Sequence, residues 1–524
     1  MKEKKDKNVY LIGAGIASLA SAAYLIREGK IPGRNIIILE ESNIIGGSMD
    51  GEKFSKNSYI MRGYRMFEKK VYTSTFDLMS FIPSLNKSGG TLRDEFLEFN
   101  KKNKVFDKCR LVENGAKVQS SYLGLSWKDK RDLMRIMNRS EVSLGSSQIK
   151  DNFGAQFFRT NYWYEMCTIF AFQPWHSAAE FRRYCLRYIQ DTPKINTLRC
   201  IENTPYAQQD SLILPILKWL NGQGVHFEKN SRVYDLDFEQ NKSVERICYF
   251  KGSKKNKIIV GENDYVLATV GSITENSSIG SMNKAPKQKI DKLSGAWELW
   301  KNIAKKQENF GRPSVFANNI DKSKLESFTI TFQGSEVPDL IKKFTGSETG
   351  HGGAITFKDS NWLISMIIPH QPHFINQPKN LTVCWGYSLF PDKKGNYVKK
   401  SMLECTGREI LIELFSHFGF EKNMEKIIKK SICIPCILPY ASSQFLPRKK
   451  GDRPAVIPEG SKNFAFIGQF CEVPEEATFT VEYSVRSAQI AVYSLLNLHH
   501  KIPPIYQGKT HIKILYNVLK TVFR

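Results

Sequence analysis

The sequence predicts an α/β fold organised around a parallel sheet, and three observations near its N-terminus support this prediction. Residues 9–12 form a short apolar run, typical of a strand buried on both faces. A glycine turn and an Ala- and Leu-rich helix over residues 17–28 follow, with Gly29 expected to end the helix. Residues 35–39 are a second apolar strand. Strand, glycine turn, helix and strand in this order predict a Rossmann-like dinucleotide-binding unit.

The turn itself has the residues that binding a pyrophosphate requires. Gly13 and Gly15 let the backbone turn sharply and approach a phosphate closely, and Ser18 is small enough for helix and strand to pack. The N-terminus of the helix would point unpaired N–H groups at the phosphates. Glu40, 27 residues after Gly13, is placed to accept hydrogen bonds from ribose hydroxyls.

A second glycine turn distinguishes between dinucleotide cofactors. Gly46, Gly47 and Ser48 follow Glu40 closely, as in flavoproteins whose second turn lies along the FAD pyrophosphate. We therefore expect FAD. Arg62 and Arg65 come soon afterwards and are expected to hold phosphate or flavin, with solvated surface charges as the alternative.

The chain returns to this unit twice. A helix over residues 212–223, strand-like segments at 225–228, 232–238 and 246–249, and an apolar strand at 264–271 form the first return. A strand at 463–468 ending in Gly468, and a helix beginning at Thr480, form the second. We expect a discontinuous FAD-binding domain over residues 1–72, 200–272 and 456–498.

The remaining segments are expected to form three further parts. Residues 73–199 predict a mainly helical lobe, residues 273–455 a mixed α+β substrate lobe, and residues 499–524 a helical C-terminal cap. The helical lobe carries an aromatic cluster that is either core or the wall of an apolar tunnel: Trp163, Phe170, Phe172, Trp175, Phe181, Tyr184 and Tyr188.

Composition excludes several classes of protein. The sequence has neither an apolar leader nor a run of 18 or more apolar residues, so we expect a cytoplasmic protein that does not span a membrane. Its 10 cysteines show no secreted-type framework. Cys433 and Cys436 lack two further ligands at matching spacing, so we expect buried thiols and no metal site. The net charge of +24 comes without a nucleic-acid-binding motif and suits solvated faces or an anionic membrane surface.

The C-terminus predicts an amphipathic helix over residues 509–524, separated from the preceding chain by Pro503, Pro504 and Gly508. Its polar face would carry Lys509, Lys513, Asn517, Lys520 and Arg524. Its apolar face would carry Ile512, Leu515, Tyr516, Leu519, Val522 and Phe523. Such a helix either docks on its own protein or a dimer partner, or lies on anionic lipid at the inner face of the membrane.

Several longer motifs resemble one family. They are LIGAGIASLASAAYLIREG, IGGSMDG, WHSAAEFRRY, TFKDSNWL, QPHF, SQFLPRKKGDRP and FTVEYSVRSAQ, spread over nearly the whole chain. Together they resemble the oleate hydratases, also called myosin-cross-reactive antigens. The resemblance implies an FAD-binding lobe, a fatty-acid-binding lobe, and addition of water across a cis double bond of an unsaturated fatty acid without net redox change.

The resemblance also implies roles for individual residues. Tyr184, in EFRRY, occupies the place of the family's proton donor, and Gln208 matches a glutamine of the same pocket. His373, in QPHF, matches a residue near the fatty-acid carboxylate.

Two departures from the family concern water activation and carboxylate binding. The family's R-G-G-R-E-M-E loop carries a glutamate assigned to water activation, but Met66 stands there in this chain and Glu68 follows two residues later. Residues 367–369 replace a polar Thr-x-Asn, so His370, His373 or a lysine would bind the carboxylate. We expect the protein to form a homodimer. The hydratase interpretation has two alternatives: an FAD-dependent oxidoreductase, such as a desaturase or amine oxidase-like enzyme, and a catalytically weak lipid-binding flavoprotein.

Overall fold

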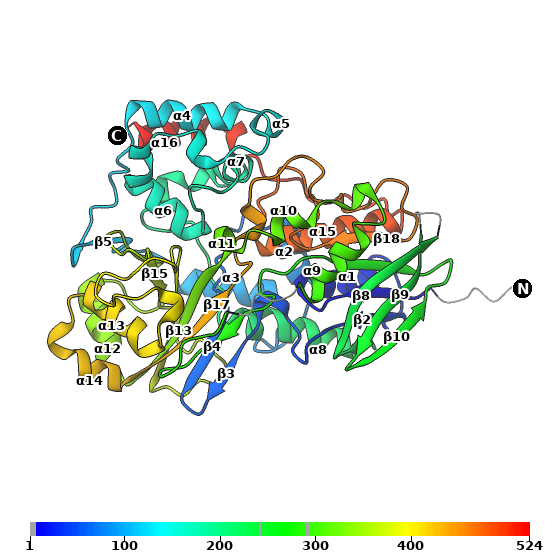
Figure 1. Ribbon diagram of the computed structural model, residues 1–524, viewed down its shortest axis with the longest axis horizontal. Coiled ribbons are helices and arrows are strands. Elements are labelled where there is room, and N and C mark those ends of the chain that lie inside the picture. Colours follow the sequence, from blue (N-terminus) through cyan, green and yellow to red (C-terminus); the bar gives the residue numbers. More distant parts are fainter. Residues whose placement is uncertain (1–6, 240–242, 289–292, 524) are drawn as a thin grey trace, which may run out of the picture.

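A five-stranded parallel sheet forms the centre of the fold. The computed structural model describes residues 7–239, 243–288 and 293–523, and it has the predicted α/β fold (Figure 1). The strand order is β18 (Phe464–Ile467), β11 (Tyr265–Thr269), β1 (Val9–Ile12), β2 (Ile36–Leu39) and β7 (His226–Glu228). All neighbouring pairs are parallel. The first predicted return of the chain therefore places β11 beside β1, and the second places β18 beside β11.

Helices cover this sheet and share one core with it. α1 (Ile16–Arg27) packs against α15 (Val481–Leu495) and α8 (Leu214–Gly222), and a π-helical turn, η6 (Gln209–Ile213), precedes α8. Gly29 was expected to end α1, but it is not the residue that caps the helix. Glu28 caps α1, and the positive φ falls on Lys30 rather than on Gly29. A Cβ on Gly29 would lie 2.4 Å from Leu496 Cδ1, so this glycine serves close packing.

An antiparallel meander and a small hairpin adjoin the parallel sheet. The meander is β8 (Ser231–Glu239), β9 (Ser243–Lys251) and β10 (Lys254–Ile259), and α9 (Gly295–Ile303) packs on β8. The hairpin is β3 (Gly51–Ser55) and β4 (Ser58–Met61). Strand β10 has no counterpart among the predicted segments.

The structure contains a second sheet, which is mixed and has eight strands. Its order is β12 (Ser278–Ile279), β17 (Ser431–Leu438), β13 (Leu325–Gln333), β16 (Leu381–Ser388), β15 (Ile364–Ile367), β14 (Ile355–Phe357), β5 (Leu111–Glu113) and β6 (Ala116–Lys117). Five helices lie between β12 and β17 along the chain: α10 (Pro313–Ala317), α11 (Ile320–Ser323), α12 (Glu336–Thr345), α13 (Gly407–His417) and α14 (Met424–Lys429). Cys433 and Cys436 are buried on β17 in two different core clusters, so they face opposite sides of the sheet.

A helical layer lies over the part of the second sheet that contains β5 and β14. It contains α4 (Trp127–Asn138), α5 (Glu141–Leu144), α6 (Asn161–Phe170), α7 (Ala178–Arg187) and α16 (Ile512–Val522) (Figure 1). Residues 73–199, which were expected to form one helical lobe, are instead divided among three parts of the molecule. α2 (Thr73–Met79) and α3 (Leu92–Lys102) contribute Phe76 and Phe96 to the core of the parallel sheet, while β5 and β6 extend the second sheet.

Candidate functional site

A large cavity lies at the carboxyl ends of the parallel strands, where ligands bind in sheets of this kind. Its volume is about 660 Å³, within the usual range for ligand sites. Eight of the residues that the sequence singled out line it: Gly13, Gly15, Glu40, Gly47, Ser48, Arg62, Arg65 and Gly468. We call it the glycine-lined cavity. Gly46 and Ser18 are not in its wall: Gly46 donates its N–H to Ala14 O at 3.0 Å, and Ser18 is buried within α1.

This cavity fits a dinucleotide by its shape. Gly15 is the N-cap of α1, so the helix N-terminus opens into the cavity. A Cβ on Gly15 would meet no protein atom within 4 Å, whereas a Cβ on Gly47 would lie 3.1 Å from Gly15 Cα. The two glycine turns therefore approach each other and leave a cradle beside Gly15.

The polar atoms of the wall also suit such a ligand. Thr269 Oγ1, Gln209 Oε1 and Gln469 Oε1 are buried and have no hydrogen-bond partner among the described residues. The Glu40 carboxylate accepts the N–H of Ala14 at 2.7 Å and of Ser42 at 2.8 Å. Each of its oxygens keeps a second lone pair for a ribose hydroxyl. The residues present thus fit FAD, the cofactor expected from the sequence.

Arg62 and Arg65 lie where this cavity meets a second one, and both line both cavities. Arg62 donates to Asp50 at 2.9 and 2.7 Å and to Gly47 O at 3.1 Å, so it braces the second glycine turn. Arg65 makes no ion pair among the described residues, its Nη1 has no hydrogen-bond partner there, and burial lowers its pKa to about 10. A buried guanidinium of this kind favours an anionic or carbonyl group in the adjoining space.

The second cavity is aromatic, and we call it the aromatic cavity. Its volume is about 130 Å³. Met66, Glu68, Tyr184 and Thr480, all singled out in the sequence, lie in its wall. Thr480 therefore borders this cavity rather than the glycine-lined one, and its side chain caps α15 by accepting the N–H of Tyr483 at 3.0 Å.

Tyr184 and Glu68 are buried groups whose protonated forms are favoured. Tyr184 is 1% exposed, its hydroxyl donates to Thr478 O, and burial raises its pKa well above the usual value. Glu68 Oε2 accepts the N–H of Val71 at 2.6 Å, and burial raises the pKa of Glu68. Among the described residues that line the aromatic cavity, Glu68 is the one carboxylate. A proton donor and a carboxylate therefore share one enclosed, mainly apolar space.

The structure does not bring the other predicted site residues into this wall. Gln208 is buried beside it and donates to Arg65 O and Thr204 Oγ1, each at 3.3 Å. The His373 ring lies 5.9 Å from that of Tyr64, a lining residue, and burial lowers the His373 pKa to about 3. His370 packs edge-on against Phe99. Both histidines are thus outside the aromatic cavity as it stands.

Several lining residues were not singled out as site residues. Tyr72, Trp385 and Tyr387 line the aromatic cavity, as does Tyr188 from the aromatic cluster. A pattern in the sequence could have indicated two of them. Trp385 and Tyr387 are two residues apart on β16, and such residues share one face of a strand. The aromatic cluster divides its roles: Phe170, Tyr184 and Tyr188 line the cavity, whereas Trp163, Phe172 and Phe181 are core.

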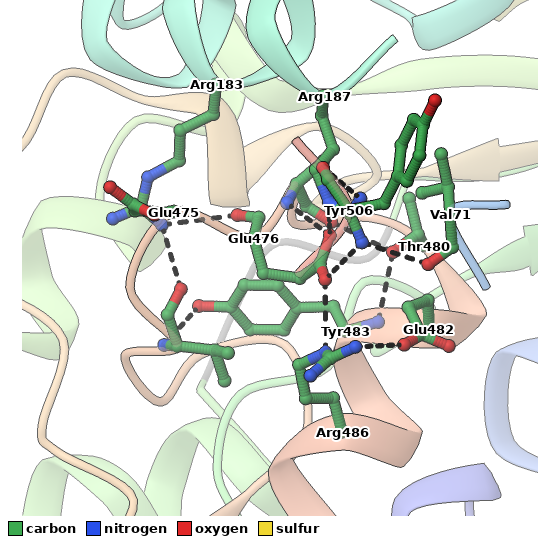
Figure 2. A network of polar contacts seen from close by, with 12 residues as sticks. Val71, Arg183, Arg187, Glu475, Glu476, Thr480, Glu482, Tyr483, Arg486 and Tyr506 are labelled. Carbon is green, nitrogen blue, oxygen red and sulfur yellow. Dashed lines mark hydrogen bonds and ion pairs between the residues drawn. The ribbon is translucent and has the colours of Figure 1, made fainter. Parts of the chain in front are cut away.

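A buried ion-pair network stands behind this wall (Figure 2). Arg187 binds Glu476 through two bonds of 2.7 and 2.8 Å, and Arg486 lies 3.2 Å from the same carboxylate. Arg486 also pairs with Glu482 at 2.9 Å. The two arginines donate further to Val71 O, Tyr506 O and Pro503 O. The network thereby joins α7, the start of α15, the segment before α2, and the C-terminal segment.

Comparisons with known proteins identify one matching family and two similar hydratases. The sequence profile of the MCRA family matches residues 6–493. The oleate hydratase of Streptococcus pyogenes serotype M49 (strain NZ131) is 37% identical over 524 residues, covering 97% of this chain and 88% of that protein. The linoleate hydratase of Lactiplantibacillus plantarum is 33% identical over 528 residues, covering 92% of each.

Solved structures resemble the fold. Cyclohexylamine oxidase from Brevibacterium oxydans IH-35A superposes with a TM-score of 0.53 at 12% identity, covering 94% of this chain and 99% of that chain. A triple mutant of putrescine oxidase redesigned in its cofactor binding gives 0.53 at 9% identity, with the same coverage. At such identities the likeness concerns the fold alone.

The cradle beside Gly15 leads to a first prediction. Gly15→Val should fold normally, because no protein atom lies within 4 Å of the added Cβ, but should lower FAD affinity at least a hundredfold by filling the cradle. Flavin fluorescence titration measures the affinity. Gly222→Val is the matched control, since its Cβ also meets open space and Gly222 lines neither cavity. Equal FAD affinity in the two variants would contradict the binding of FAD beside Gly15.

Proposed function

The chain belongs to the MCRA family, and we propose from this membership that it is a fatty acid hydratase, a hydro-lyase that uses FAD. The reaction adds water across a cis double bond of an unsaturated fatty acid and gives a hydroxy fatty acid without net redox change. The observation that carries the proposal is the sequence identity of 37% and 33% to two hydratases, over 97% and 92% of this chain. The aromatic cavity beside the glycine-lined one supports it.

Tyr184 is the proton donor of this proposal. Hydration of an isolated alkene begins when a proton is delivered to one carbon, and positive charge then develops on the other. The Tyr184 hydroxyl is enclosed, and its raised pKa keeps it protonated at physiological pH. The rings of Tyr188 and Phe170 line the same cavity, and an aromatic face turned toward a developing cation would stabilise it.

Glu68 is the group that takes a proton from water. Met66 lies in the wall at the position of the family's glutamate but has no basic group, whereas the Glu68 carboxylate lies in the same wall. Its raised pKa makes it a stronger base than an exposed glutamate. Gln208 holds the loop from behind through Arg65 O.

FAD would occupy the glycine-lined cavity, where it would supply a flat ring and a fixed electrostatic field beside the junction of the cavities. The unpartnered Nη1 of Arg65 would bind an oxygen or anionic nitrogen of the flavin. The aromatic cavity, at about 130 Å³, is smaller than ordinary ligand sites of about 300 Å³ or more, so a long acyl chain must displace side chains of its wall. His373, next to Tyr64, becomes available to a carboxylate only through such a movement.

The C-terminal helix supports a peripheral membrane location. Ile514, Val518, Thr521 and Val522 of α16 are half-buried toward the protein, whereas Ile512, Tyr516, Leu519 and Phe523 are 85%, 63%, 49% and 40% exposed. Phe523 meets Trp127 of α4, itself 75% exposed, and Lys130 lies 5.0 Å from the Phe523 ring. Lys513 and Lys520 flank this apolar stripe, and Arg524 lies outside the described residues.

An anionic bilayer fits this surface, because apolar side chains and lysines on one face bind the lipid interface. Among the described residues, no helix has both the length and the apolar character to cross a bilayer. We propose that α16 docks on its own protein by one face and on lipid by another, at the inner face of the membrane. The homodimer stays a prediction.

The reaction itself is tested with a pool of unsaturated fatty acids in heavy-oxygen water. We expect hydroxy fatty acids that carry the heavy oxygen, with no stoichiometric flavin reduction, and mass spectrometry detects them. Tyr184→Phe should lower the rate about 10²- to 10⁴-fold while fatty-acid binding persists. Product that requires an electron acceptor would favour the oxidoreductase alternative, and tight lipid binding without turnover would favour the lipid-binding flavoprotein.

The loop of residues 62–68 is tested by a pair of substitutions. Glu68→Gln should lower kcat about 10²-fold or more, and should remove the acid limb of the rate profile, which should lie above the usual glutamate range because burial raises the Glu68 pKa. Met66→Glu should raise turnover. Glu95→Gln is the control, since this half-buried carboxyl lines neither cavity. If Glu68→Gln and Met66→Glu both have the same rate as the control, water activation does not depend on this loop.

Membrane binding is tested by sedimentation with phosphatidylglycerol vesicles. Lys513→Gln with Lys520→Gln should lose about 2 kcal/mol, or roughly thirtyfold in affinity. Tyr516→Ser with Leu519→Ser should weaken binding similarly. Ile259→Ser with Tyr397→Ser is the control, because these exposed residues lie on β10 and in the second-sheet region. Equal binding by the control and both α16 variants, or by a protein ending at Gln507, would eliminate the helix as the anchor.

A further inference from the structure

Two neutral donors in the wall of the aromatic cavity have no hydrogen-bond partner among the described residues. They are the Ser327 hydroxyl, in a residue that is 1% exposed, and the Trp385 indole N–H, in a residue that is 9% exposed. The Cys436 thiol beside Ser327 is only a weak partner. An unpaired donor in an apolar interior is unfavourable, so both atoms indicate a partner that the folded chain does not supply.

Strand register brings these two donors together on one face of the second sheet. Ser327 of β13 lies directly opposite Tyr387 of β16, and Trp385 precedes Tyr387 by two residues, so the three side chains share a face. Diagonal neighbours of this kind are about 7–8 Å apart, within reach of a long side chain. The rings of Trp385 and Tyr387 stack, with centroids 5.1 Å apart and planes 26° apart. The two donors can therefore bind one group.

Neighbouring hydroxyls of this part of the cavity bind within the protein. Thr329 Oγ1 accepts the N–H of Met61 at 3.1 Å, and the Tyr387 hydroxyl donates to Thr168 O. Thr356 Oγ1 donates to Thr168 Oγ1 at 2.9 Å. The two unpaired donors thus differ from the polar groups around them, and this favours a ligand site over imperfect packing.

An unsaturated fatty acid can satisfy these donors at one place only, because its oxygen atoms are confined to the head of the chain. Ser327 and Trp385 belong to the second sheet, whereas Tyr184 and Glu68 come from α7 and the segment before α2. The groups that would act on the double bond therefore come from other elements than the two donors. One acyl chain can meet the first pair with its double bond and the second pair with its head.

The charges in the wall indicate which form of the head group fits. Both donors are neutral, and the cations among the described lining residues are Arg62 and Arg65, at the junction of the two cavities. Arg62 is paired with Asp50, and Arg65 would bind the flavin. A carboxylate at Ser327 and Trp385 would be a buried charge without a counter-ion, whereas an uncharged carbonyl oxygen needs only hydrogen-bond donors.

We propose that Ser327 and Trp385 bind the carbonyl oxygen of the substrate's head group, and that this head is uncharged, as in a protonated acid or an ester. This inference rests on the proposed function, because it takes an unsaturated acyl chain as the ligand. The indole N–H and the hydroxyl each donate to one lone pair of the carbonyl oxygen. Holding the head at this place sets how far the chain enters, and so which double bond reaches Tyr184.

The test is isothermal titration of the FAD-loaded protein with three ligands of one chain length: myristoleic acid, its methyl ester, and the cis-alkene without a head group. At mildly alkaline pH, where the acid is ionised, the ester should bind at least as tightly as the acid. Trp385→Phe and Ser327→Ala should each weaken ester binding about tenfold, a usual effect of one hydrogen bond. The alkene has no oxygen, so its affinity should not change.

Trp175→Phe is the matched control. The Trp175 indole N–H already donates to Lys322 O at 2.9 Å, and Trp175 lines neither cavity, so all three affinities should stay as in the wild type. If Trp385→Phe does not fold in thermal unfolding scans, Ser327→Ala decides the matter, since it removes a single oxygen atom. An equal loss of affinity for ester and alkene would show a packing role and overturn the proposal.

The outcomes distinguish this site from the proposed function. Ester affinity that is unchanged in both Trp385→Phe and Ser327→Ala overturns the site, whether or not the protein hydrates alkenes. An acid that binds much more tightly than its ester would show a carboxylate site and overturn it too. A protein that binds the ester through Ser327 and Trp385 but forms no labelled hydroxy acid confirms the site and contradicts the hydratase.

Discussion

The pairing of Arg187 and Arg486 with Glu476 is the interaction on which the rest of the site depends. Both guanidiniums and the carboxylate are almost fully enclosed, and charges so placed are tolerated only when every partner is present. Those partners come from four separate parts of the chain. Satisfying the charges therefore fixes α7, the start of α15 and the segment after Glu68 in one arrangement. The wall that carries Tyr184 is rigid for an electrostatic reason, while apolar packing supplies its shape.

The division into two cavities follows from the same geometry. The parallel sheet ends in glycine turns, which leave space for a large polar ligand, whereas the second sheet and α7 enclose a small apolar space. The two meet at Arg62 and Arg65. Arg62 forms an ion pair with Asp50, whereas Arg65 has no ionic partner within the part of the chain that the structure describes. The two arginines thus connect the polar space on one side to the aromatic space on the other.

The sequence predicted those parts of the structure that depend on local pattern. The order of β1, the glycine turn, α1 and β2 follows from residues within reach of one another, and so does the start of α15 at Thr480. Arg62 was expected at a phosphate or flavin, but its bonds to Asp50 depend on a contact that no periodicity reveals. Likewise Tyr72 carries no motif and joins the site only because α2 packs toward the parallel sheet. The identity of Glu68 as the one carboxylate of the wall also required the fold.

The strand order of the parallel sheet determines when the chain can acquire its structure during synthesis. β1 lies between β2, which follows it closely, and β11, and the sheet is completed only by β18 at residues 464–467. At ribosomal speeds of about 5–20 residues per second, roughly 20–90 s pass between the emergence of the first strand and that of the last. β1 can pair with β2 early, but its other edge waits for β11, and the sheet stays incomplete until β18 emerges. Until then, unpaired strand edges and apolar surface are exposed, which makes an incomplete chain prone to aggregate in a way that the finished molecule is not.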